Sequence, residues 1–597
     1  MRNLHLVKGL LVAAVVAGGT MVIGCSSAKH AAPPAEELEQ LAAPEPTDGV
    51  DSDDVDEVAQ EIVVDLKDDL SESEVAAFAR SYGVALHPNS PWSEAHDKIE
   101  IVDVDTRADE LSLLDRLSRD PRVEHAEPMA LYRASFVPND PLYASKQWHL
   151  KRVGAEKAWE YTCGQGVTVA VIDTGIACFN DGPFSRGTDL SGTRCGGGWN
   201  FVDDNARAAD DHGHGTHVAG TIAQTTNNGM GTAGLAYCAT LMPIKVLSRQ
   251  GFGSTANVAE GIRYAADEGA QVINMSLGGP IKSQILEDAV NHALAKGVVI
   301  VAAAGNSGRS VGYPAAYPGV IAVSATDDKD NIARFSSRGP QVAIGAPGVA
   351  VTQQTVCNGG KDKCEVFGTF NGTSMASPHV AGVAAMVESL GVTDPAAVRD
   401  ALESTARPKE GKNLYGAGIL DGGAAASHVF WRHLMVRLGA LLALGWLVRR
   451  RIRKQGGKPA RTLGSMIGAL AAGIGLLPIV PLFGLASHAG KLRTALELAM
   501  RPIGEWDLVL MGAGTHRWLL LASAIPAVVL TLFGFASKRL RPFIGGVALG
   551  SAALLAQIAW SADVAYVGGS FLLRIWAVVN ALVCLWICRM ALDAKKA

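Results

Sequence analysis

Residues 372–382 read GTSMASPHVAG, and the rest of the chain is organised around this stretch. Small residues surround Ser374, and an apolar, Ala-rich run from Val380 to Leu390 follows before Gly391. Apolar residues recur at helical spacing along that run, and glycine is a common helix stop, so the pattern predicts a helix. Ser374 then lies where a turn enters the helix, near free backbone N–H groups and the positive end of the helix dipole. The position suits either an ordinary N-cap serine or a nucleophile whose attack creates an oxyanion.

Length and composition limit the classes of function that the chain can have. A chain of 597 residues is too long for one core, so several domains are expected. The chain holds 53 Lys and Arg against 58 Asp and Glu, and this balance gives no reason to expect a nucleic-acid partner. Nine cysteines are present and none forms a CxxC pair, which argues against a zinc knuckle or a thioredoxin-type site.

The N-terminus indicates export. Residues 1–24 combine a basic start, an apolar core and the sequence VIGC at 22–25, which resembles the lipobox of bacterial lipoproteins. We therefore expect a lipoprotein signal peptide and lipidation of Cys25; a plain signal peptide and an uncleaved anchor are the alternatives. Residues 25–59 are rich in Ala, Pro and acidic residues and are predicted to form a solvated tether.

Two soluble domains are expected next. Residues 60–135 predict strands at 61–66, 98–104 and 122–132 and helices at 71–81 and 108–118, an order compatible with a ferredoxin-like α+β module. Residues 150–428 predict an α/β domain, because continuous apolar strands alternate with helices at 255–269 and 283–297, as in a parallel sheet covered on both faces. The expected strands are 167–172, 241–246, 272–275, 298–303 and 320–323.

Residues 431–597 are predicted to form an α-helical membrane domain. Apolar runs at about 432–448, 464–487, 518–536, 543–560 and 571–592 each approach the ~20 residues that cross a bilayer. Basic clusters lie at 449–461, 538–541 and 595–596. With about five spans these clusters share one side, which the positive-inside rule makes cytoplasmic, so residues 150–428 face outward. Glu505 and Asp507 are expected in a loop, and the spans hold no acidic relay, which favours an anchoring role.

Three polar residues outside the opening stretch supply complementary chemistry. Asp173 ends a strand, where a carboxylate can hold an imidazole in one tautomer, although capping the next turn is the alternative role. Residues 211–221 read DHGHGTHVAGT, in which His214 is expected to act as a base rather than a metal ligand, because the HExxH spacing is absent. Asn306 ends another strand, where its amide can donate to an oxyanion or simply form a turn.

The chain order Asp, His, Ser is the order of subtilisin, and the chain resembles the subtilisin-like serine peptidases over about residues 150–425. The motifs that carry the resemblance are VIDTG at 171–175, HGTHVAGT at 214–221, AGN at 304–306, GTSMASPHVAG at 372–382 and YGAGILD at 415–421. The resemblance implies a serine endopeptidase with Ser374 as nucleophile, His214 as base, Asp173 as orienting carboxylate and Asn306 as oxyanion donor. A catalytically silent binding protein on this fold and a helical sensor or transport module with a proteolytic head are the alternatives.

The resemblance also implies how substrate and calcium bind. The expected walls of the substrate cleft are Gly251 and Gly253 on one side and Ser276, Leu277 and Gly278 on the other. The sequence NNGMGTAG at 227–234 resembles the family's calcium loop, with Asn228 as a side-chain ligand and backbone carbonyls beside it. Asp189 is the expected distant carboxylate ligand for Ca²⁺, although the insert at 176–210 leaves that assignment open, and a plain turn is the alternative for the loop.

The remaining expectations concern maturation and location. Residues 60–135 resemble the family's inhibitory propeptides, so the enzyme is expected as an autoinhibited precursor that is cut within 134–146. An outward location allows disulfides: Cys357 with Cys364 closes a short polar loop, and Cys178 with Cys195 is a second pairing. The expected place is the cell envelope, at a bacterial inner membrane with the peptidase domain outside. The expected partners are polypeptide substrates, the chain's own propeptide and the membrane. If the precursor is cut, the lipid leaves with the propeptide and the C-terminal helices alone retain the protease.

Overall fold

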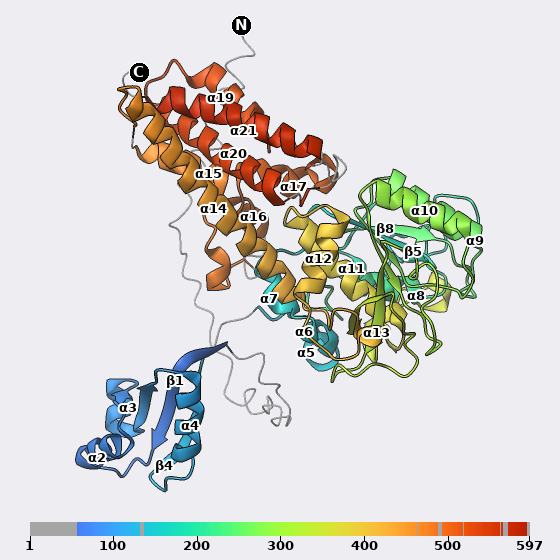
Figure 1. Ribbon diagram of the computed structural model, residues 1–597. Helices are drawn as coiled ribbons and strands as arrows, with labels where there is room; N and C mark the ends of the chain where they lie inside the picture. The colour runs from blue at the N-terminus through green and yellow to red at the C-terminus, as the bar shows by residue number, and fades with distance from the viewer. Residues whose placement is uncertain are drawn as a thin grey trace, which may run out of the picture. The chain divides into compact units, whose positions relative to one another are not determined.

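A computed structural model of the chain describes residues 56–131, 136–460, 462–486, 492–516, 519–561, 563–564 and 571–593. The expected signal peptide, Cys25, nearly all of the tether and the last basic cluster lie outside these residues. The chain divides into two compact units, residues 1–133 and 134–597, and each is described by itself. Figure 1 shows the helices and strands of both units and labels many of them.

The first unit is a four-stranded antiparallel sheet carrying helices. Its elements are β1 (Asp56–Leu66), α2 (Glu72–Tyr82), β2 (His87–Pro88), α3 (Pro91–His96), β3 (Ile99–Asp103), α4 (Arg107–Leu117) and β4 (Val123–Leu131), and the sheet order is β2-β3-β1-β4. Alternate residues of β1 point inward, so Ile62, Val64 and Leu66 are fully buried beside Phe78 of α2 and Leu117 of α4. The predicted strands and helices of this module therefore occur in the predicted order.

The second unit contains a parallel sheet flanked by helices, as the sequence predicts. The sheet order is β12-β11-β10-β9-β5-β8-β6, with β7 also beside β8. The strands are β5 (Thr168–Asp173), β6 (Arg194–Cys195), β7 (Trp199–Asn200), β8 (Thr240–Lys245), β9 (Val272–Met275), β10 (Val299–Ala303), β11 (Ile321–Thr326) and β12 (Val342–Pro347), and β13 (Val351–Gln354) pairs with β14 (Phe367–Phe370) in a separate ribbon.

Each face of this sheet has its own core. Alternate residues of β5 point to opposite faces, Val169 and Val171 to one core and Ala170 and Ile172 to the other. Helices α9 (Thr255–Asp267) and α10 (Gln284–Ala295) cover the second face, and α8 (His214–Ala223) and α11 (Thr373–Ser389) cover the first. Shorter elements surround them: α5 (Pro141–Lys146), α6 (Trp148–Arg152), α7 (Ala155–Trp159), η3 (Thr188–Leu190), η4 (Asn358–Gly360), α12 (Pro395–Ser404) and α13 (Lys412–Tyr415).

The C-terminal region is helical, and its helices differ from the five predicted runs. It comprises α14 (Gly422–Lys454), α15 (Leu463–Gly473), η5 (Val480–Phe483), α16 (Arg493–Met500), η7 (Ile503–Glu505), α17 (Trp506–Met511), α18 (Ala513–His516), α19 (Ile525–Gly534), α20 (Arg541–Ser561) and α21 (Phe571–Leu592). Within the described residues only α14, α20 and α21 are long and apolar enough to cross a membrane. The run 464–487 ends as a helix at Gly473, because Gly475 has a φ of 93° and Pro478 and Pro481 follow.

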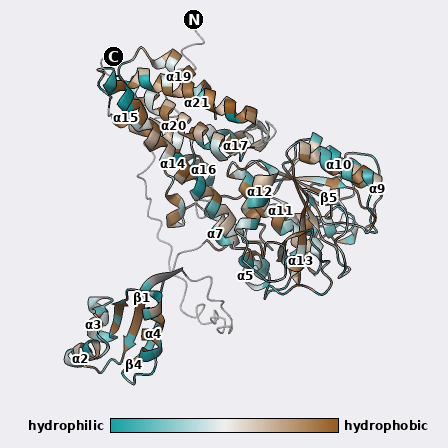
Figure 2. Cartoon of the chain, viewed as in Figure 1, coloured by the Kyte–Doolittle hydropathy of each residue, from teal (hydrophilic) through white to brown (hydrophobic). Residues whose placement is uncertain are grey.

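The expected boundary near residue 430 falls inside a helix. Helix α14 begins at Gly422 within the sheet domain, where Ala425, Ala426 and Val429 are fully buried in its core. The same helix continues to Lys454, so no linker separates the sheet domain from the helical region. Hydrophobic residues run along α19 and α21 at the far end of this region (Figure 2).

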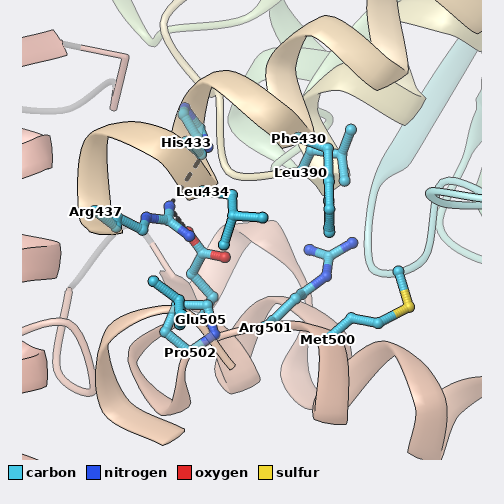
Figure 3. Close-up of a pocket in the computed structure, with 10 residues that line it drawn as sticks. Leu390, Phe430, His433, Leu434, Arg437, Met500, Arg501, Pro502 and Glu505 are labelled. Carbon is cyan, nitrogen blue, oxygen red and sulfur yellow. Dashed lines mark hydrogen bonds and ion pairs between the residues drawn. The ribbon is translucent and has the colours of Figure 1, made fainter. Parts of the chain in front are cut away.

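Glu505 and Asp507 do not lie in an exposed loop. Glu505 ends η7 and Asp507 lies in α17, and both side chains are buried. The Glu505 carboxylate accepts a hydrogen bond from Arg437 of α14, whose guanidinium also donates to Gln557 Oε1 at 3.0 and 3.1 Å. Figure 3 shows Arg437 and Glu505 in contact on one side of a small cavity, with Arg501 and Leu390 on its other side. The contact with Arg437 compensates the charge of Glu505 in the interior, and Asp507 Oδ1 accepts a hydrogen bond from the Leu508 backbone N–H at 3.0 Å.

Candidate active site

Asp173 and His214 form a hydrogen-bonded pair at the carboxyl edge of the sheet. Asp173 is the last residue of β5 and is fully buried. Its Oδ1 accepts hydrogen bonds from His214 Nδ1 at 2.7 Å and from the Thr174 backbone N–H at 2.8 Å. A carboxylate on Nδ1 fixes the hydrogen there and leaves Nε2 as the acceptor on the imidazole. The side chain of His214 is 22% exposed, so Nε2 can be reached from the cleft.

The start of α8 brings His214 to the end of β5. Gly213 precedes the helix with a φ of 104°, a conformation that favours glycine. A Cβ on Gly215 would lie 2.1 Å from the Gly175 carbonyl oxygen, so only glycine allows the two segments to pack this closely. Asp210 ties them together: Oδ1 accepts from Thr174 Oγ1 at 2.8 Å and Oδ2 from the Thr216 backbone at 2.9 Å. The sequence prediction missed Asp210, whose only signal was its place beside the glycine- and histidine-rich motif.

The charge state of His214 depends on its buried partner. Burial disfavours the charged imidazole, but the charge of Asp173 and its hydrogen bond outweigh that effect and raise the pKa of His214 above 6.5. The pKa values of His217 in the same motif and of His379 in α11 shift in the opposite direction. Burial lowers the pKa of His217 to about 4, and its Nε2 contacts the Gly368 carbonyl at 3.0 Å. Burial likewise lowers the pKa of His379 to about 3.

A metal centre at these histidines has no support in the described residues. His214 turns Nδ1 to Asp173, while His217 is a core residue stacked on Phe370 with ring centroids 4.2 Å apart. Across the described ranges, no group of three or more His, Cys, Asp or Glu side chains is placed to hold a metal ion. The arrangement therefore fits a base and its orienting carboxylate.

Ser374 lies in the first turn of α11 at the floor of the cleft. The helix begins at Thr373 rather than at the predicted Val380, so Ser374 is already helical and its backbone N–H is one of the unsatisfied donors at the helix start. Its Oγ donates a hydrogen bond to the Ser276 carbonyl at 3.0 Å, and Ser276 Oγ donates to the Ser374 carbonyl at 2.7 Å. In this resting arrangement the hydroxyl points to Ser276 rather than to His214.

Asn306 presents its amide N–H₂ beside Ser374. Asn306 Oδ1 accepts hydrogen bonds from the Thr373 backbone N–H and from Thr373 Oγ1, both at 2.9 Å, which fixes the side-chain amide. A Cβ built on Gly372 would lie 3.4 Å from Asn306 Nδ2 and 3.6 Å from the Ser374 backbone nitrogen. Two donors thus face one small space that glycine leaves open, the arrangement that stabilises an oxyanion.

These residues share one cleft of about 610 Å³. All five wall residues expected from the sequence line it, Gly251 and Gly253 on one side and Ser276, Leu277 and Gly278 on the other, together with His214, Asn306 and Ser374. The sequence prediction missed Tyr313, Pro314, Ile281 and Leu286, which also line the cleft. The cleft is therefore an open groove lined by glycines together with apolar and polar side chains, suited to an extended chain.

The expected calcium residues lie together and bring a third with them. Asn228 Nδ2 donates to Asp189 Oδ1 at 2.8 Å, and the loop amides of Asn227 and Asn228 donate to Asp140. Burial raises the pKa of Asp189 to about 6 and raises the pKa of Asp140 as well. Two buried carboxylates lie beside the side-chain amide of Asn228, and no basic side chain of the described residues is paired with them, so the group has the oxygen ligands that fit Ca²⁺. Asp140 was missed because it lies far from the loop in sequence.

Three disulfides brace this unit. The structure joins Cys357 to Cys364 and Cys178 to Cys195, the two pairings expected from the sequence, and also Cys163 to Cys238, which the sequence did not suggest. The two cysteines of this third bridge are 75 residues apart in the sequence, so their spacing alone gave no signal for the pairing. Cys584 and Cys588 of α21 are free and buried.

Known proteins match the region that holds this site. A sequence profile of the subtilase family (Peptidase_S8) matches residues 164–418. Thermitase of Thermoactinomyces vulgaris is 41% identical over 285 residues, which are 47% of this chain and 96% of thermitase. A thermophilic serine proteinase of Bacillus sp. (strain AK1) is 38% identical over 60% of this chain and 84% of its own length. Subtilisin Savinase of Lederbergia lenta is 42% identical over 47% of this chain and 98% of its own length.

Proposed function

The chain belongs to the subtilase family of serine peptidases, and we propose that it cleaves peptide bonds with Ser374, His214, Asp173 and Asn306. The observation that carries the assignment is geometric. A buried carboxylate lies 2.7 Å from the imidazole of His214, and the same cleft holds the serine at a helix start and the amide of Asn306. These are the four roles that acyl transfer through a serine requires.

The reaction follows from these positions. Ser374 turns its hydroxyl from the Ser276 carbonyl to His214 Nε2 and attacks the carbonyl carbon of the scissile bond while Nε2 takes the proton. Asp173 stabilises the resulting imidazolium, and Asn306 Nδ2 with the Ser374 backbone N–H binds the oxyanion. The C–N bond then breaks, and the leaving amine takes the proton from Nε2. Water hydrolyses the acyl-enzyme by the same proton transfers in reverse.

A fluorophosphonate probe tests the nucleophile directly. We expect the processed wild-type protein to be labelled at Ser374 and the Ser374→Ala variant to be unlabelled. Ser377 is the matched control, because it lies one turn further along the same helix and is buried with its Oγ 2.9 Å from Ser276 Oγ. Ser377→Ala should keep the label, and labelling of Ser374→Ala would refute the assignment.

We propose that residues 60–135 act as an inhibitory propeptide. Support comes from the antiparallel sheet with two covering helices, which forms a compact unit of its own ahead of the peptidase domain. The cut is proposed within 134–146, and the N-terminal lipid at Cys25 would leave with the propeptide. N-terminal sequencing of the wild type beside Ser374→Ala tests this. A lipid that remains linked to Ser374-containing protein after processing would contradict it.

We propose that the C-terminal helices anchor the enzyme in a bacterial inner membrane, with the peptidase domain outside. Helices α14, α20 and α21 have the length and composition of membrane spans. Large apolar side chains are exposed on α19 and α21, among them Phe533 and Phe571, each 77% exposed, as on a lipid-facing surface. Ala460 after α14 donates to the Leu592 carbonyl at the end of α21, so the first basic cluster lies beside the C-terminal end of the last helix. Release of the full chain by alkaline carbonate would contradict this anchoring.

We propose that Asp140, Asp189 and Asn228 hold a calcium ion with neighbouring carbonyls. A bound Ca²⁺ would neutralise two buried carboxylates and so stabilise the loop at 227–234 against unfolding. Chelation should therefore lower the melting temperature of the Ser374→Ala protein by several degrees. The same chelation should leave Asp189→Asn, which lacks one carboxylate, nearly unaffected, and an equal response of the two proteins would refute the site.

A further inference from the structure

A groove of about 860 Å³ lies between α14, α15 and α20, away from the active site. Apolar side chains form most of its walls: Leu438, Leu441 and Leu442 from α14, Met466 and Leu470 from α15, and Leu549 from α20. At one end the lining changes to Arg449, Arg450, Arg453 and Lys454. The groove is therefore apolar along its length and cationic at one mouth.

Glycines create the space. A Cβ on Gly468 of α15 would lie 2.5 Å from the Phe543 carbonyl oxygen, and one on Gly546 of α20 would lie 2.2 Å from the Ser465 carbonyl oxygen. Helices α15 and α20 therefore touch backbone to backbone, as small residues allow in membranes. Helix α14 meets α20 at Gly445, whose Cβ would lie 3.4 Å from Leu549 Cδ2. Close packing of one pair of helices leaves a channel beside the third.

The charge at the mouth is unbalanced. Arg450, Arg453 and Lys454 are exposed, and the ion pairs found among the described residues include none of the three. The lining contains no Asp or Glu, and the nearby carboxylate of Asp593 lies against Gly457 outside it. The guanidinium of Arg450 lies 5.2 Å from the ring centroid of Trp446, which is itself exposed. Arginine and tryptophan together are typical of the level of lipid headgroups.

We propose that this groove binds an anionic phospholipid of the cytoplasmic leaflet. Its phosphate lies among Arg450, Arg453 and Lys454, and an acyl chain follows the apolar walls toward Leu438. From Leu438 to Lys454 the helix rises about 24 Å at 1.5 Å per residue. One leaflet of the hydrocarbon core, about 15 Å, together with its headgroup layer has a similar length. The inference rests on the proposed membrane location of the helices and adds a specific ligand to it.

Native mass spectrometry of the full-length Ser374→Ala protein tests the proposal, with autolysis prevented by the substitution. The detergent-solubilised protein is exchanged into phosphatidylglycerol or phosphatidylcholine with identical acyl chains. We expect one phosphatidylglycerol to stay bound at a concentration about tenfold or more below that needed for phosphatidylcholine. Adding Arg450→Gln, Arg453→Gln and Lys454→Gln together should abolish this preference. Gly445→Leu, which fills the groove, should reduce retention of both lipids.

Lys538→Gln with Arg539→Gln is the matched control, because both residues are basic and exposed and lie outside the groove lining. This control should retain phosphatidylglycerol as the parent does. Equal retention of the two lipids by the parent, unchanged preference in the triple variant, or a dimer in place of a lipid adduct would overturn the proposal. Alkaline extraction of the same membranes distinguishes the failures: a chain that stays in the pellet without lipid preference refutes only the groove, whereas a released chain refutes the anchoring.

Discussion

Asp173 controls the protonation of His214, and this gives a pH prediction. Only the neutral imidazole can take the serine proton, and the pKa of His214 is raised because Asp173 outweighs burial. Activity should therefore be full at alkaline pH and should fall as the pH drops through a value above 6.5. In Asp173→Asn the raising effect is lost, so the acidic limb of kcat/KM should move to lower pH. The rate should also fall by about four orders of magnitude, because an amide favours the wrong tautomer.

The measurement is kcat/KM for a chromogenic peptide across pH. Asp267→Asn is the control, because Asp267 also accepts a hydrogen bond from a histidine, His292, at 2.7 Å, but this pair is on the surface. Its pH profile should match the wild type. An unchanged acidic limb in Asp173→Asn would contradict the assigned pairing.

Gly372 gives a second prediction at the same scale. A methyl group there would lie 3.4 Å from Asn306 Nδ2 and 3.6 Å from the Ser374 nitrogen, in the space proposed for the oxyanion. Gly372→Ala should lower kcat by about 10²–10³-fold, the cost of losing one such donor in subtilisin itself, with KM little changed. Gly196→Ala, whose Cβ would meet only Thr240 Cγ2 at 3.6 Å, should keep normal kinetics. Wild-type kcat in Gly372→Ala would show that the oxyanion does not use this space.

At the scale of elements, α11 links the nucleophile to the helical region. Ser374 lies in its first turn, and the Ser389 carbonyl in its last turn accepts a hydrogen bond from Arg501. The side chain of Arg501 is 3% exposed, so removing it would leave a buried carbonyl unsatisfied, while the carboxylate of Glu497 would keep Arg493 as its partner. A cation also suits the negative end of a helix dipole.

Arg501→Ala should therefore destabilise the protein by about 1–3 kcal/mol, the usual cost of leaving a buried hydrogen-bonding group unsatisfied. The measurement is thermal unfolding of the variant in the Ser374→Ala background. Arg399→Ala is the control, because Arg399 forms a partly exposed pair with Glu403 and its loss should cost less than about 1 kcal/mol. Equal melting temperatures for the two variants would argue against a structural role for Arg501.

Most elements near the site could be predicted from the sequence. The strands that end at Asp173 and before Asn306 are continuous apolar runs, and their periodicity depends only on local residues. Strand β12 was missed, because Gly345 and Pro347 interrupt its apolar run. The predicted spans 464–487 and 518–536 became the shorter helices α15 and α19, because hydropathy averages over the Gly and Pro residues that end a helix.

The contacts between distant segments could not be predicted. Arg493, Glu497 and Arg501 repeat every four residues, a pattern that indicates a solvated helix face. In the structure Arg493 donates to the Trp159 carbonyl at 2.7 Å and to Tyr237 Oη at 2.8 Å, inside the interface with the sheet domain. Only the tertiary partners decide that these charges are buried. The same holds for Asp140 beside the loop at 227–234 and for the bridge between Cys163 and Cys238.

At the scale of the whole molecule, the helical region is part of the peptidase core rather than a detachable anchor. Val480, Met500, Leu508 and Ala513 belong to the same buried cluster as the sheet and α11. The 285 matched residues cover 96% of thermitase. Thermitase is therefore too short to contain a counterpart of these helices. Burying one large apolar side chain adds about 1.5–3 kcal/mol to the free energy of unfolding. Several such side chains therefore equal a large part of the total free energy of unfolding, which is typically about 5–15 kcal/mol.

A chain truncated after residue 432 should therefore aggregate or melt well below the full-length protein. The measurement compares solubility and melting temperature of the Ser374→Ala protein with and without residues 433–597. A chain truncated after residue 516, which keeps Val480, Met500, Leu508 and Ala513, is the matched control and should retain more of the stability. A soluble, fully stable product that ends at residue 432 would show that the helices only anchor the enzyme.

The central claim is that Ser374 hydrolyses peptide bonds with the help of His214 and Asp173. The most direct test is the rate of cleavage of an internally quenched peptide by processed wild-type protein and by Ser374→Ala prepared in parallel. Ser374→Ala is co-expressed with the propeptide as a separate chain, so that it folds, and an added protease then removes the propeptide. The two samples are then equally folded and equally processed. We expect turnover by the wild type and a loss of about 10⁶-fold in Ser374→Ala, as in subtilisin itself. Comparable cleavage by the two proteins would contradict it.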